Sequence, residues 1–175
     1  MLIVDESAIY GSHKNMRADH PEYIENCKKH LEFFIKRDRN HPSVITWSMQ
    51  NEMRWVDGRD GYKVAMKELI RVIKECDASR PVSFDGDNRL VDYEDMEIIS
   101  MHYNIDGTIR DWNKEKPLAF GEHGKWHYTS PQVCAGEGGV GAYLGFDDCM
   151  TALGQEEQHF NEYGRKEEVT ALCPF

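Results

Sequence analysis

Apolar residues recur along the chain with two different spacings, which predict strands alternating with helices. From Pro21 to about residue 38, and again over 60–76, apolar residues fall three or four positions apart. This spacing buries one face of a helix, so both segments are predicted helices. Short β-branched or aromatic runs predict five strands and a sixth at the C-terminus. The six predicted strands are 2–4, 43–49, 81–84, 97–103, 117–120 and 169–172.

The order of these elements indicates the fold class. Strands separated by helices are typical of βαβ units and a parallel sheet. No Gly-x-Gly-x-x-Gly follows the first strand and no Gly-x-x-x-x-Gly-Lys occurs, so the main signatures of dinucleotide and P-loop folds are missing. A (β/α)8 TIM barrel is the better parallel architecture, but a complete one needs about 250 residues. Because the chain has 175 residues, we expect one α/β domain over 1–175 that forms a partial TIM barrel.

The second half of the chain gives weaker signals. A brief helix is predicted over 109–112 and a longer one over 155–166, with a glycine-rich loop over 134–145 between them. Five cysteines lie far apart, without a Cys-x-x-Cys pair, which predicts reduced thiols rather than a disulfide framework.

Charge and hydropathy exclude several function classes. The chain has 31 acidic and 21 basic residues, a net charge of −10, whereas nucleic-acid binding needs clustered Lys and Arg. No apolar run approaches the length of a transmembrane helix. The apolar start at 2–4 meets Asp5 at once, which is too short and too acidic for a signal peptide. We therefore expect a soluble protein that binds neither nucleic acid nor membranes, and the sequence does not identify its compartment.

Two glutamates stand just past the predicted ends of strands. Glu52 follows the strand 43–49, and Glu122 follows the strand 117–120. Chemistry in TIM barrels takes place at these strand ends. Two predicted strands lie between the two positions, so the carboxylates would face one another across the barrel mouth. Cleavage of a glycosidic bond needs such a pair, whereas the alternative interpretation is that both are ordinary surface glutamates.

A long string of residues resembles a known family. The string RNHPSVITWSMQNE, over 39–52, resembles the central signature of glycoside hydrolase family 2, which includes β-galactosidases, β-glucuronidases and β-mannosidases. Other segments resemble the third, fifth, sixth and seventh barrel strands of that family, and the C-terminus resembles the start of the eighth. These segments are 2–6, 79–82, 101–103, 117–124 and 169–175. The resemblance implies an incomplete catalytic barrel with approximately strands 3 to 8, in which strands 1 and 2 are missing.

The resemblance also implies roles for individual residues. Glu52 would be the general acid/base and Glu122 the nucleophile of a retaining β-glycosidase. Asn51 would hydrogen-bond the substrate 2-hydroxyl, and Tyr103 would hold the nucleophile by its phenol. No cofactor is implied.

Further candidates for substrate contact lie close to these residues in the sequence. His102 neighbours Tyr103, and Trp126 lies in a loop after the strand that leads to Glu122. A tryptophan in that place would stack on a sugar ring, although tryptophans are as often part of the core.

No metal site is predicted. His123 and His127 are four residues apart, but the glutamate beside them is not placed as in His-Glu-x-x-His. Asp85 and Asp87 suggest the start of an EF-hand, but the required glycine and terminal glutamate are missing, so a solvated turn is predicted there.

Two hypotheses of different class follow. The first is a retaining β-glycosidase with a carbohydrate substrate of the β-galactoside, β-glucuronide or β-mannoside class. The second is an inactive barrel fragment, or a sugar-binding pseudoenzyme, that needs the missing strands or a partner chain. Unpaired strand edges at 2–4 and 169–172 would then favour self-association. The sequence does not identify the sugar.

Overall fold

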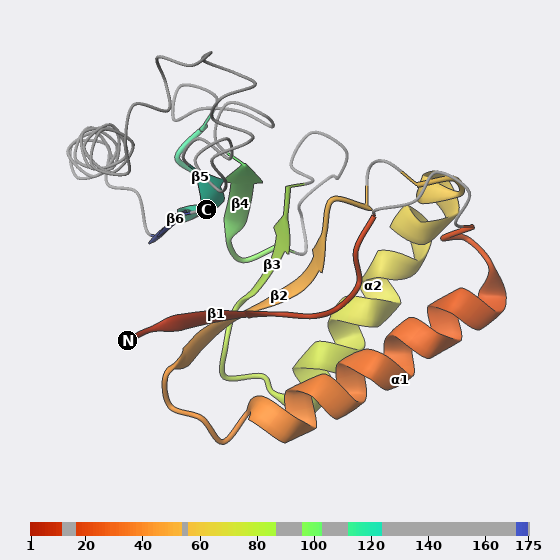
Figure 1. The fold of residues 1–175 in the computed structure, drawn as a ribbon, viewed down its shortest axis with the longest axis horizontal. Coiled ribbons are helices and arrows are strands. Elements are labelled where there is room, and N and C mark those ends of the chain that lie inside the picture. Colours follow the sequence, from red (N-terminus) through yellow and green to blue (C-terminus); the bar gives the residue numbers. More distant parts are fainter. Residues whose placement is uncertain (12–16, 54–55, 87–95, 103–111, 124–170, 175) are drawn as a thin grey trace, which may run out of the picture.

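The computed structural model describes residues 1–11, 17–53, 56–86, 96–102, 112–123 and 171–174 (Figure 1). Within these residues, six strands and two long helices follow one another in the order that the sequence predicts. They are β1 (Ile3–Glu6), α1 (Pro21–Asp38), β2 (Val44–Asn51), α2 (Arg59–Cys76), β3 (Val82–Asp85), β4 (Ile99–His102), β5 (Leu118–His123) and β6 (Ala171–Pro174).

Neighbouring strands run parallel and keep the order of the sequence. β2 pairs with β1 and β3, and β5 pairs with β4 and β6. β3 and β4, which stand at the adjoining edges of the two three-stranded sheets, contact each other. The described strands therefore form one curved row (Figure 1). This order is that of a barrel wall and differs from a doubly wound sheet, in which the order reverses at a switch point.

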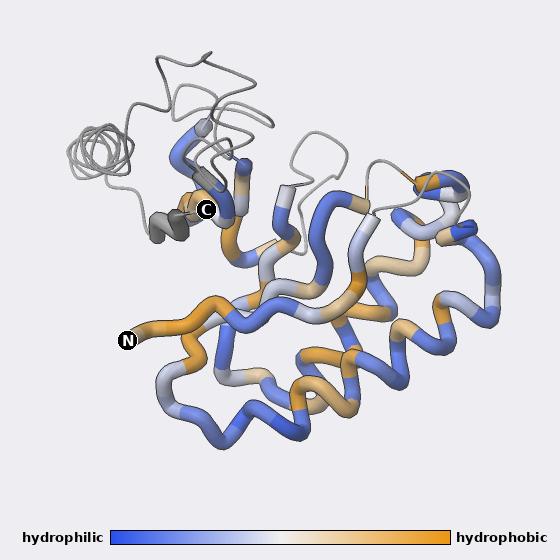
Figure 2. The backbone as a smooth tube through the Cα atoms, in the orientation of Figure 1, coloured by the Kyte–Doolittle hydropathy of each residue, from blue (hydrophilic) through white to orange (hydrophobic). Residues whose placement is uncertain are grey.

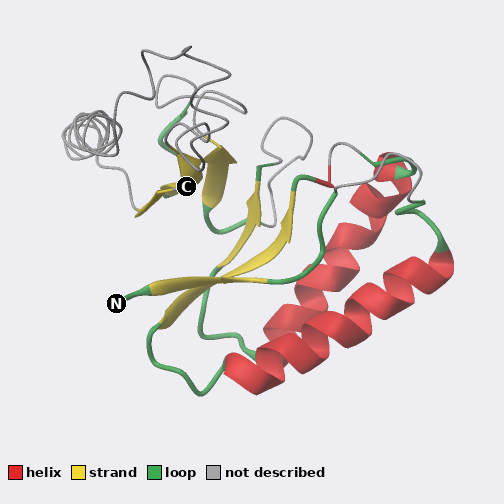
Figure 3. Cartoon of the chain, in the orientation of Figure 1, coloured by secondary structure: helices red, strands yellow, loops and turns green. Residues whose placement is uncertain are grey.

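Both helices cover the same side of β1–β3 (Figure 3). α1 begins at Pro21, whose fixed φ suits a first helical turn, and the His20 side chain accepts a hydrogen bond from the Glu22 N–H. Figure 2 shows hydrophobic and hydrophilic residues alternating along both helices, as expected for helices with one buried face. The buried residues of these faces are Ile24, Cys27, Leu31, Phe34 and Ile35 on α1, and Tyr62, Met66, Leu69 and Ile73 on α2.

The two faces of β2 differ in character. Trp47 and Met49 belong to the apolar core that β2 shares with the helices. There the Trp47 and Phe34 rings pack edge to face, with their centroids 5.5 Å apart. Successive side chains of a strand point to opposite faces, so the residues between them line the inner side of the row. On β2, β3 and β4 these buried inner residues are polar: Thr46, Ser48, Gln50, Ser83, Asp85, Ser100 and His102. The inner side is therefore a polar surface, unlike the branched apolar interior that most TIM barrels have.

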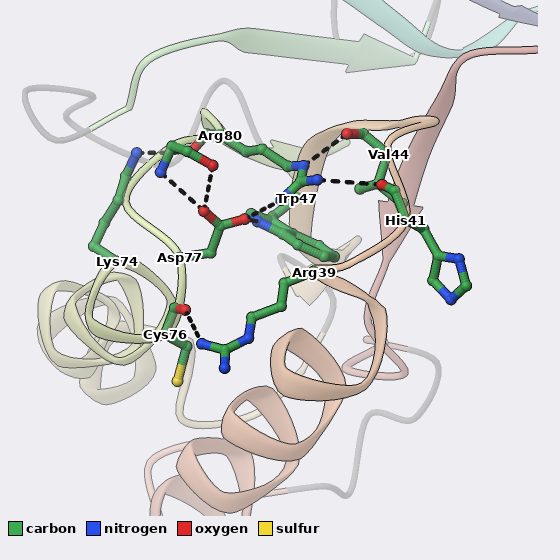
Figure 4. Close-up of polar contacts among 9 residues, drawn as sticks. Arg39, His41, Val44, Trp47, Lys74, Cys76, Asp77 and Arg80 are labelled. Atoms are coloured by element: carbon green, nitrogen blue, oxygen red, sulfur yellow. Dashed lines mark hydrogen bonds and ion pairs between the residues drawn. The ribbon is translucent and has the colours of Figure 1, made fainter.

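A polar cluster around Arg80 lies where β2 and β3 begin (Figure 4). The Arg80 guanidinium donates to the carbonyl oxygens of Val44, at 2.7 Å, and His41, at 3.2 Å, and forms an ion pair with Asp77. It also stacks 5.5 Å from the Trp47 ring, whose indole N–H donates to Asp77 at 3.1 Å. The cluster thus joins the turn before β2 to the turn before β3.

Five of the six strands end later along the chain than the sequence predicts, and two of them, β2 and β5, carry the candidate site. β2 continues to Asn51, and β5 continues to His123. Both strands are paired on each side, and these partners extend the ladders. Glu122 therefore lies inside β5 rather than just past its end, whereas Glu52 follows β2 directly as expected.

Some predicted elements lie outside the described residues. These are most of the brief helix at 109–112, the loop at 134–145 and the helix at 155–166. In the described part of the chain, no helix is both long and apolar enough to cross a membrane.

Candidate active site

Four neighbouring strands bring titratable side chains to one edge of the row. Glu52 follows β2, Asp85 ends β3, His102 ends β4, and Glu122 lies near the end of β5. Parallel strands in register place their carboxyl ends at the same edge, as the pairings Asn51–Asp85 and His102–Glu122 show. This edge is where TIM barrels carry their chemistry.

The two glutamates that the sequence singles out meet at one nitrogen atom. His102 Nδ1 lies 3.2 Å from Glu52 Oε1 and 3.4 Å from Glu122 Oε2. The two carboxylate oxygens are therefore no farther apart than the sum of these distances. The side chains of Glu52 and Glu122 remain 20% and 29% exposed, while that of His102 is fully buried. A pair of accessible carboxylates thus lies above a buried imidazole.

Asn51 contacts the second oxygen of Glu122. Its Nδ2 donates to Glu122 Oε1 at 3.3 Å, so His102 and Asn51 contact different oxygens of the same carboxylate. This arrangement fixes the rotation of the Glu122 carboxyl group, because each oxygen has a separate partner.

Asp85 holds the far side of the imidazole. Its Oδ1 lies 3.4 Å from His102 Nε2 and accepts a hydrogen bond from the Ser100 hydroxyl at 2.8 Å. Two glycines leave room for this contact. A Cβ on Gly121 would lie 1.9 Å from Asp85 Oδ1, and one on Gly86, which has φ +71°, would lie 2.8 Å from His102 Cε1.

A fourth carboxylate, that of Glu6, approaches from β1. The Ser48 hydroxyl donates to Glu6 Oε2 at 2.9 Å. Partial burial of the carboxyl group and the nearby charge of Asp85 raise the pKa of Glu6 to about 7. Glu6 keeps an exposed side on the edge strand, where water screens these effects.

The closely spaced charges shift the ionisation of the central residues. Burial raises the pKa of Glu122, and the charges of Asp85 and Glu52 add to this, against the opposing effects of His102 and Asn51. Burial alone would lower the pKa of His102, but its hydrogen bond with Asp85 and the charges of Asp85, Glu122 and Glu52 raise it above the ordinary value. The imidazole is therefore stabilised in its cationic form.

One group of three residues also has ligand types that metals prefer. Asp85, His102 and Glu122 each present a ligand atom, and these atoms lie within 4.8 Å of one another. Asp85 and Glu122, however, face opposite nitrogens of the ring. An imidazole offers one nitrogen to an ion, so a single ion does not suit all three residues as they stand. The arrangement fits the imidazole itself as the central cation.

The structure adds Glu6 and Asp85 to the residues that sequence analysis singled out. The solvated turn predicted at Asp85 is wrong at this residue, which is buried at the end of β3. A signal was present, because Asp85 ends its strand just as Glu52 follows its own. Tyr103 and Trp126 lie outside the described residues, so their predicted roles stay predictions.

Comparison with known families agrees with this fold. The model of the glycosyl hydrolases family 2, TIM barrel domain, matches residues 3–135. The match covers most of the chain and includes β1–β5, which carry the whole candidate site. The chain belongs to this glycosyl hydrolase family.

Solved structures resemble the chain in fold. A β-glucuronidase from Ruminococcus gnavus in complex with uronic isofagomine is 23% identical with a TM-score of 0.69, covering 100% of this chain and 34% of that one. A β-glucuronidase from an uncultured Clostridium sp. is 15% identical with a TM-score of 0.60, covering 99% and 33%. A family 2 β-galacturonidase from Eisenbergiella tayi, bound to galacturonate, is 20% identical with a TM-score of 0.55, covering 69% and 24%. The chain thus spans at most about a third of these proteins.

Proposed function

We propose that the protein carrying this chain is a retaining β-glycosidase, with Glu52 as general acid/base and Glu122 as nucleophile. The observation that carries the proposal is the shared contact of both carboxylates with His102 Nδ1. Family membership supports the same reaction class. In such an enzyme two carboxyl groups flank the scissile bond, and their separation decides the stereochemical outcome.

The contacts of the two carboxylates with His102 are compatible with a retaining mechanism. Retaining enzymes hold their carboxyl groups about 5–5.5 Å apart, whereas inverting enzymes leave about 6.5–9.5 Å for a water molecule. Because one oxygen of each carboxylate lies 3.2 Å and 3.4 Å from the same nitrogen, these two oxygens are at most about 6.6 Å apart, a limit that includes the shorter separation. The resemblance of this chain to the family favours direct attack by one carboxylate, and we propose this mechanism.

In the first step, the Glu122 carboxylate attacks the anomeric carbon as the bond to the leaving oxygen breaks. Glu52 donates its proton to that oxygen, so Glu122 becomes a neutral glycosyl ester and Glu52 becomes anionic. In the second step, Glu52 removes a proton from water, and the water oxygen attacks the anomeric carbon. The ester bond breaks, and Glu122 returns to its carboxylate form.

The substrate class is proposed from the solved relatives, which are β-glucuronidases and a β-galacturonidase. A β-glucuronide is therefore the first candidate substrate, and β-galactosides and β-mannosides are the alternatives within the family. We propose that the six strands correspond to strands 3 to 8 of the family barrel.

A second candidate function follows from the edge of β1. Leu2 and Ile3 are 70% and 38% exposed, and the described residues pair β1 on one side only, with β2. An edge of this kind favours pairing with another chain. The chain by itself would then be an inactive fragment that self-associates through β1. Sedimentation of the 175-residue chain tests this, because an active monomer would contradict it.

The glycosidase proposal is tested by variants of the intact protein that carries this chain. Hydrolysis of 4-nitrophenyl β-D-glucuronide, galactoside and mannoside is measured, and proton NMR follows the anomer formed first. We expect retention of configuration and loss of turnover in Glu122→Gln. Glu52→Ala should keep the first step on nitrophenyl substrates, which need no acid, and lose it on alkyl glycosides.

Glu115→Gln is the matched control. This exposed glutamate stands before β5, and its hydrogen bonds within the described part of the chain are with Asn113. The variant should retain wild-type activity. Undiminished turnover in Glu122→Gln would show that the nucleophile is another residue, and an inverted product would exclude the double displacement.

A further inference from the structure

His102 stands where both halves of the proposed reaction need a hydrogen-bond donor. We infer that His102 is a positioning residue. Its Nδ1–H donates a hydrogen bond to Glu122 in the resting enzyme and to Glu52 while the glycosyl intermediate exists, and the proton stays on His102. This inference rests on the proposed function. The buried ring lies beneath the two carboxylates, so His102 acts on the substrate through them.

The geometry suits a proton on both ring nitrogens, because the anionic Glu122 and Asp85 face opposite nitrogens in the resting enzyme. Nδ1 faces Glu52 and Glu122, and Nε2 faces Asp85 at 3.4 Å. Carboxylates are acceptors, and a neutral imidazole has only one N–H to offer. An imidazolium satisfies both sides, and the raised pKa of His102 agrees with this.

The groups around His102 come from every neighbouring strand. Asp85 faces it from β3, Glu52 from the end of β2 and Glu122 from β5. Beyond them, Glu6 on β1 interacts electrostatically with Asp85, and Tyr10 interacts with Glu52. Among the described residues, the groups that face the imidazolium directly are thus acidic, and the Tyr10 phenol is linked to it only through the carboxylates.

The net charge of the glutamate pair stays constant during the reaction, but the negative charge moves from Glu122 to Glu52. In the resting enzyme the negative charge is on Glu122 and the proton is on Glu52. After the first step Glu122 is a neutral ester, and the negative charge is on Glu52. Nδ1 lies within 3.4 Å of an oxygen of each, so one donor faces the anion in both states without moving to a new site.

Burial gives this contact its strength. The His102 side chain has no exposed surface, so water does not screen its charge from the two carboxylates. Asp85 compensates the imidazolium from behind and, with the hydrogen bond from Ser100, fixes the plane of the ring. A group already oriented for the charge of both states adds no reorganisation when the reaction takes place.

The experiment replaces the ring and measures pH profiles in the intact protein that carries this chain. His102→Asn keeps a neutral donor near the Nδ1 position but loses the cation and the contact with Asp85. We expect kcat/KM for a nitrophenyl glycoside to fall about 10²-fold. The acid limb of its pH profile should move upward by about one pH unit or more, because the lost cation no longer lowers the pKa of Glu122.

The second step is measured separately. With a dinitrophenyl glycoside the first step is fast, so kcat reports hydrolysis of the intermediate. We expect kcat to fall as well, because Glu52 then lacks its donor. A fall in kcat/KM alone would show that His102 serves Glu122 only and would overturn the exchange of partners.

Two further variants separate this role from a structural one. His41→Asn makes the same change at an exposed histidine near Arg80 and should leave both pH limbs in place. Asp85→Asn keeps the shape of the site, so it remains informative if His102→Asn does not fold. Its activity should be lost at alkaline pH first, because His102 loses the charge that raises its pKa.

The outcomes distinguish the two proposals. If Glu122→Gln retains activity, the proposed function fails and this inference fails with it. If Glu122→Gln is inactive but His102→Asn and Asp85→Asn lower the rate without moving either pH limb, the glycosidase stands and the role of His102 is overturned.

Discussion

Gly11 touches the backbone that carries Glu52. A Cβ atom on Gly11 would lie 2.0 Å from the carbonyl oxygen of Glu52, and the Gly11 N–H donates to the Asn51 carbonyl at 3.0 Å. Glu52 itself has φ 52°, in the left-handed region that residues with a side chain rarely adopt. The segment after β1 therefore packs directly against the backbone of Glu52, where the chain leaves β2.

We expect Gly11→Ala to reduce activity more than stability. The added methyl group forces the backbones of Gly11 and Glu52 apart, since neither is a flexible side chain. A displacement of a catalytic group by about 1 Å can lower the rate about 10²-fold. The check is kcat/KM on a nitrophenyl glycoside, together with the free energy of unfolding in denaturant.

Gly61→Ala is the control for crowding alone. A Cβ there, on α2, would lie 2.4 Å from the Cβ atom of Asp19 and not against the backbone of Glu52. This variant should change stability and leave the activity of each folded molecule unchanged. Equal loss of activity in both variants would show that Gly11 supports only the general fold.

The local pattern is sufficient to predict the helices and strands that the structure describes. On α1 the spacing of Ile24, Leu31 and Ile35 indicates the buried face, and these residues are buried against the strands. The ends of β2 and β5 could not be predicted in this way, because pairing with neighbouring strands extends them. The Asn51–Asp85 pair joins residues that only the fold brings together.

The candidate site was predictable in part. Glu52 and Glu122 were found because each lies at the end of a strand and within a family string. Their contact through His102 was not predicted, because it depends on the alignment of three strands. Glu6 was missed for a similar reason: its partner Ser48 is 42 positions away in the chain.

Arg80→Lys should destabilise the protein without changing its chemistry. Lysine cannot donate to the Val44 and His41 carbonyls and to Asp77 in one plane, so some of these acceptors lose their hydrogen-bond donor. We expect the free energy of unfolding to fall by about 1–3 kcal/mol. Guanidinium denaturation followed by tryptophan fluorescence provides the measurement.

Arg71→Lys is the matched control, since Arg71 is 68% exposed and its ion pair within the described residues is with the equally accessible Glu75. Its effect should be close to zero. An Arg80→Lys protein as stable as the wild type would mean that the fork geometry around Arg80 adds nothing to stability.

Asp77 should make part of this stability dependent on pH. Burial alone would raise its pKa, but hydrogen bonds from Ser79, Arg80 and Trp47 outweigh burial and hold the pKa well below the usual value of 3.8. A carboxyl with a lowered folded pKa stabilises the protein above the unfolded pKa, and this contribution is lost as the pH falls below it. The wild type should therefore exceed Asp77→Asn in unfolding free energy near pH 7 and lose this advantage in the acid range. A difference that does not vary between pH 7 and pH 3 would contradict the assignment.

Glu6 should have the opposite pH dependence. Partial burial and the charge of Asp85 raise its pKa from 4.5 to about 7, so the folded protein binds a proton that the unfolded chain has already released. A carboxyl with a raised folded pKa costs nothing below the unfolded pKa, and its cost grows as the pH rises from about 4.5 to about 7. Glu6→Gln cannot ionise, so its unfolding free energy should gain on the wild type across this interval and stay level above it. Because Glu6 keeps an exposed side, the gain should be modest. If the unfolding free energy of Glu6→Gln falls relative to that of the wild type between pH 5 and pH 7, Glu6 is an ordinary ionised carboxylate that the hydrogen bond from Ser48 stabilises.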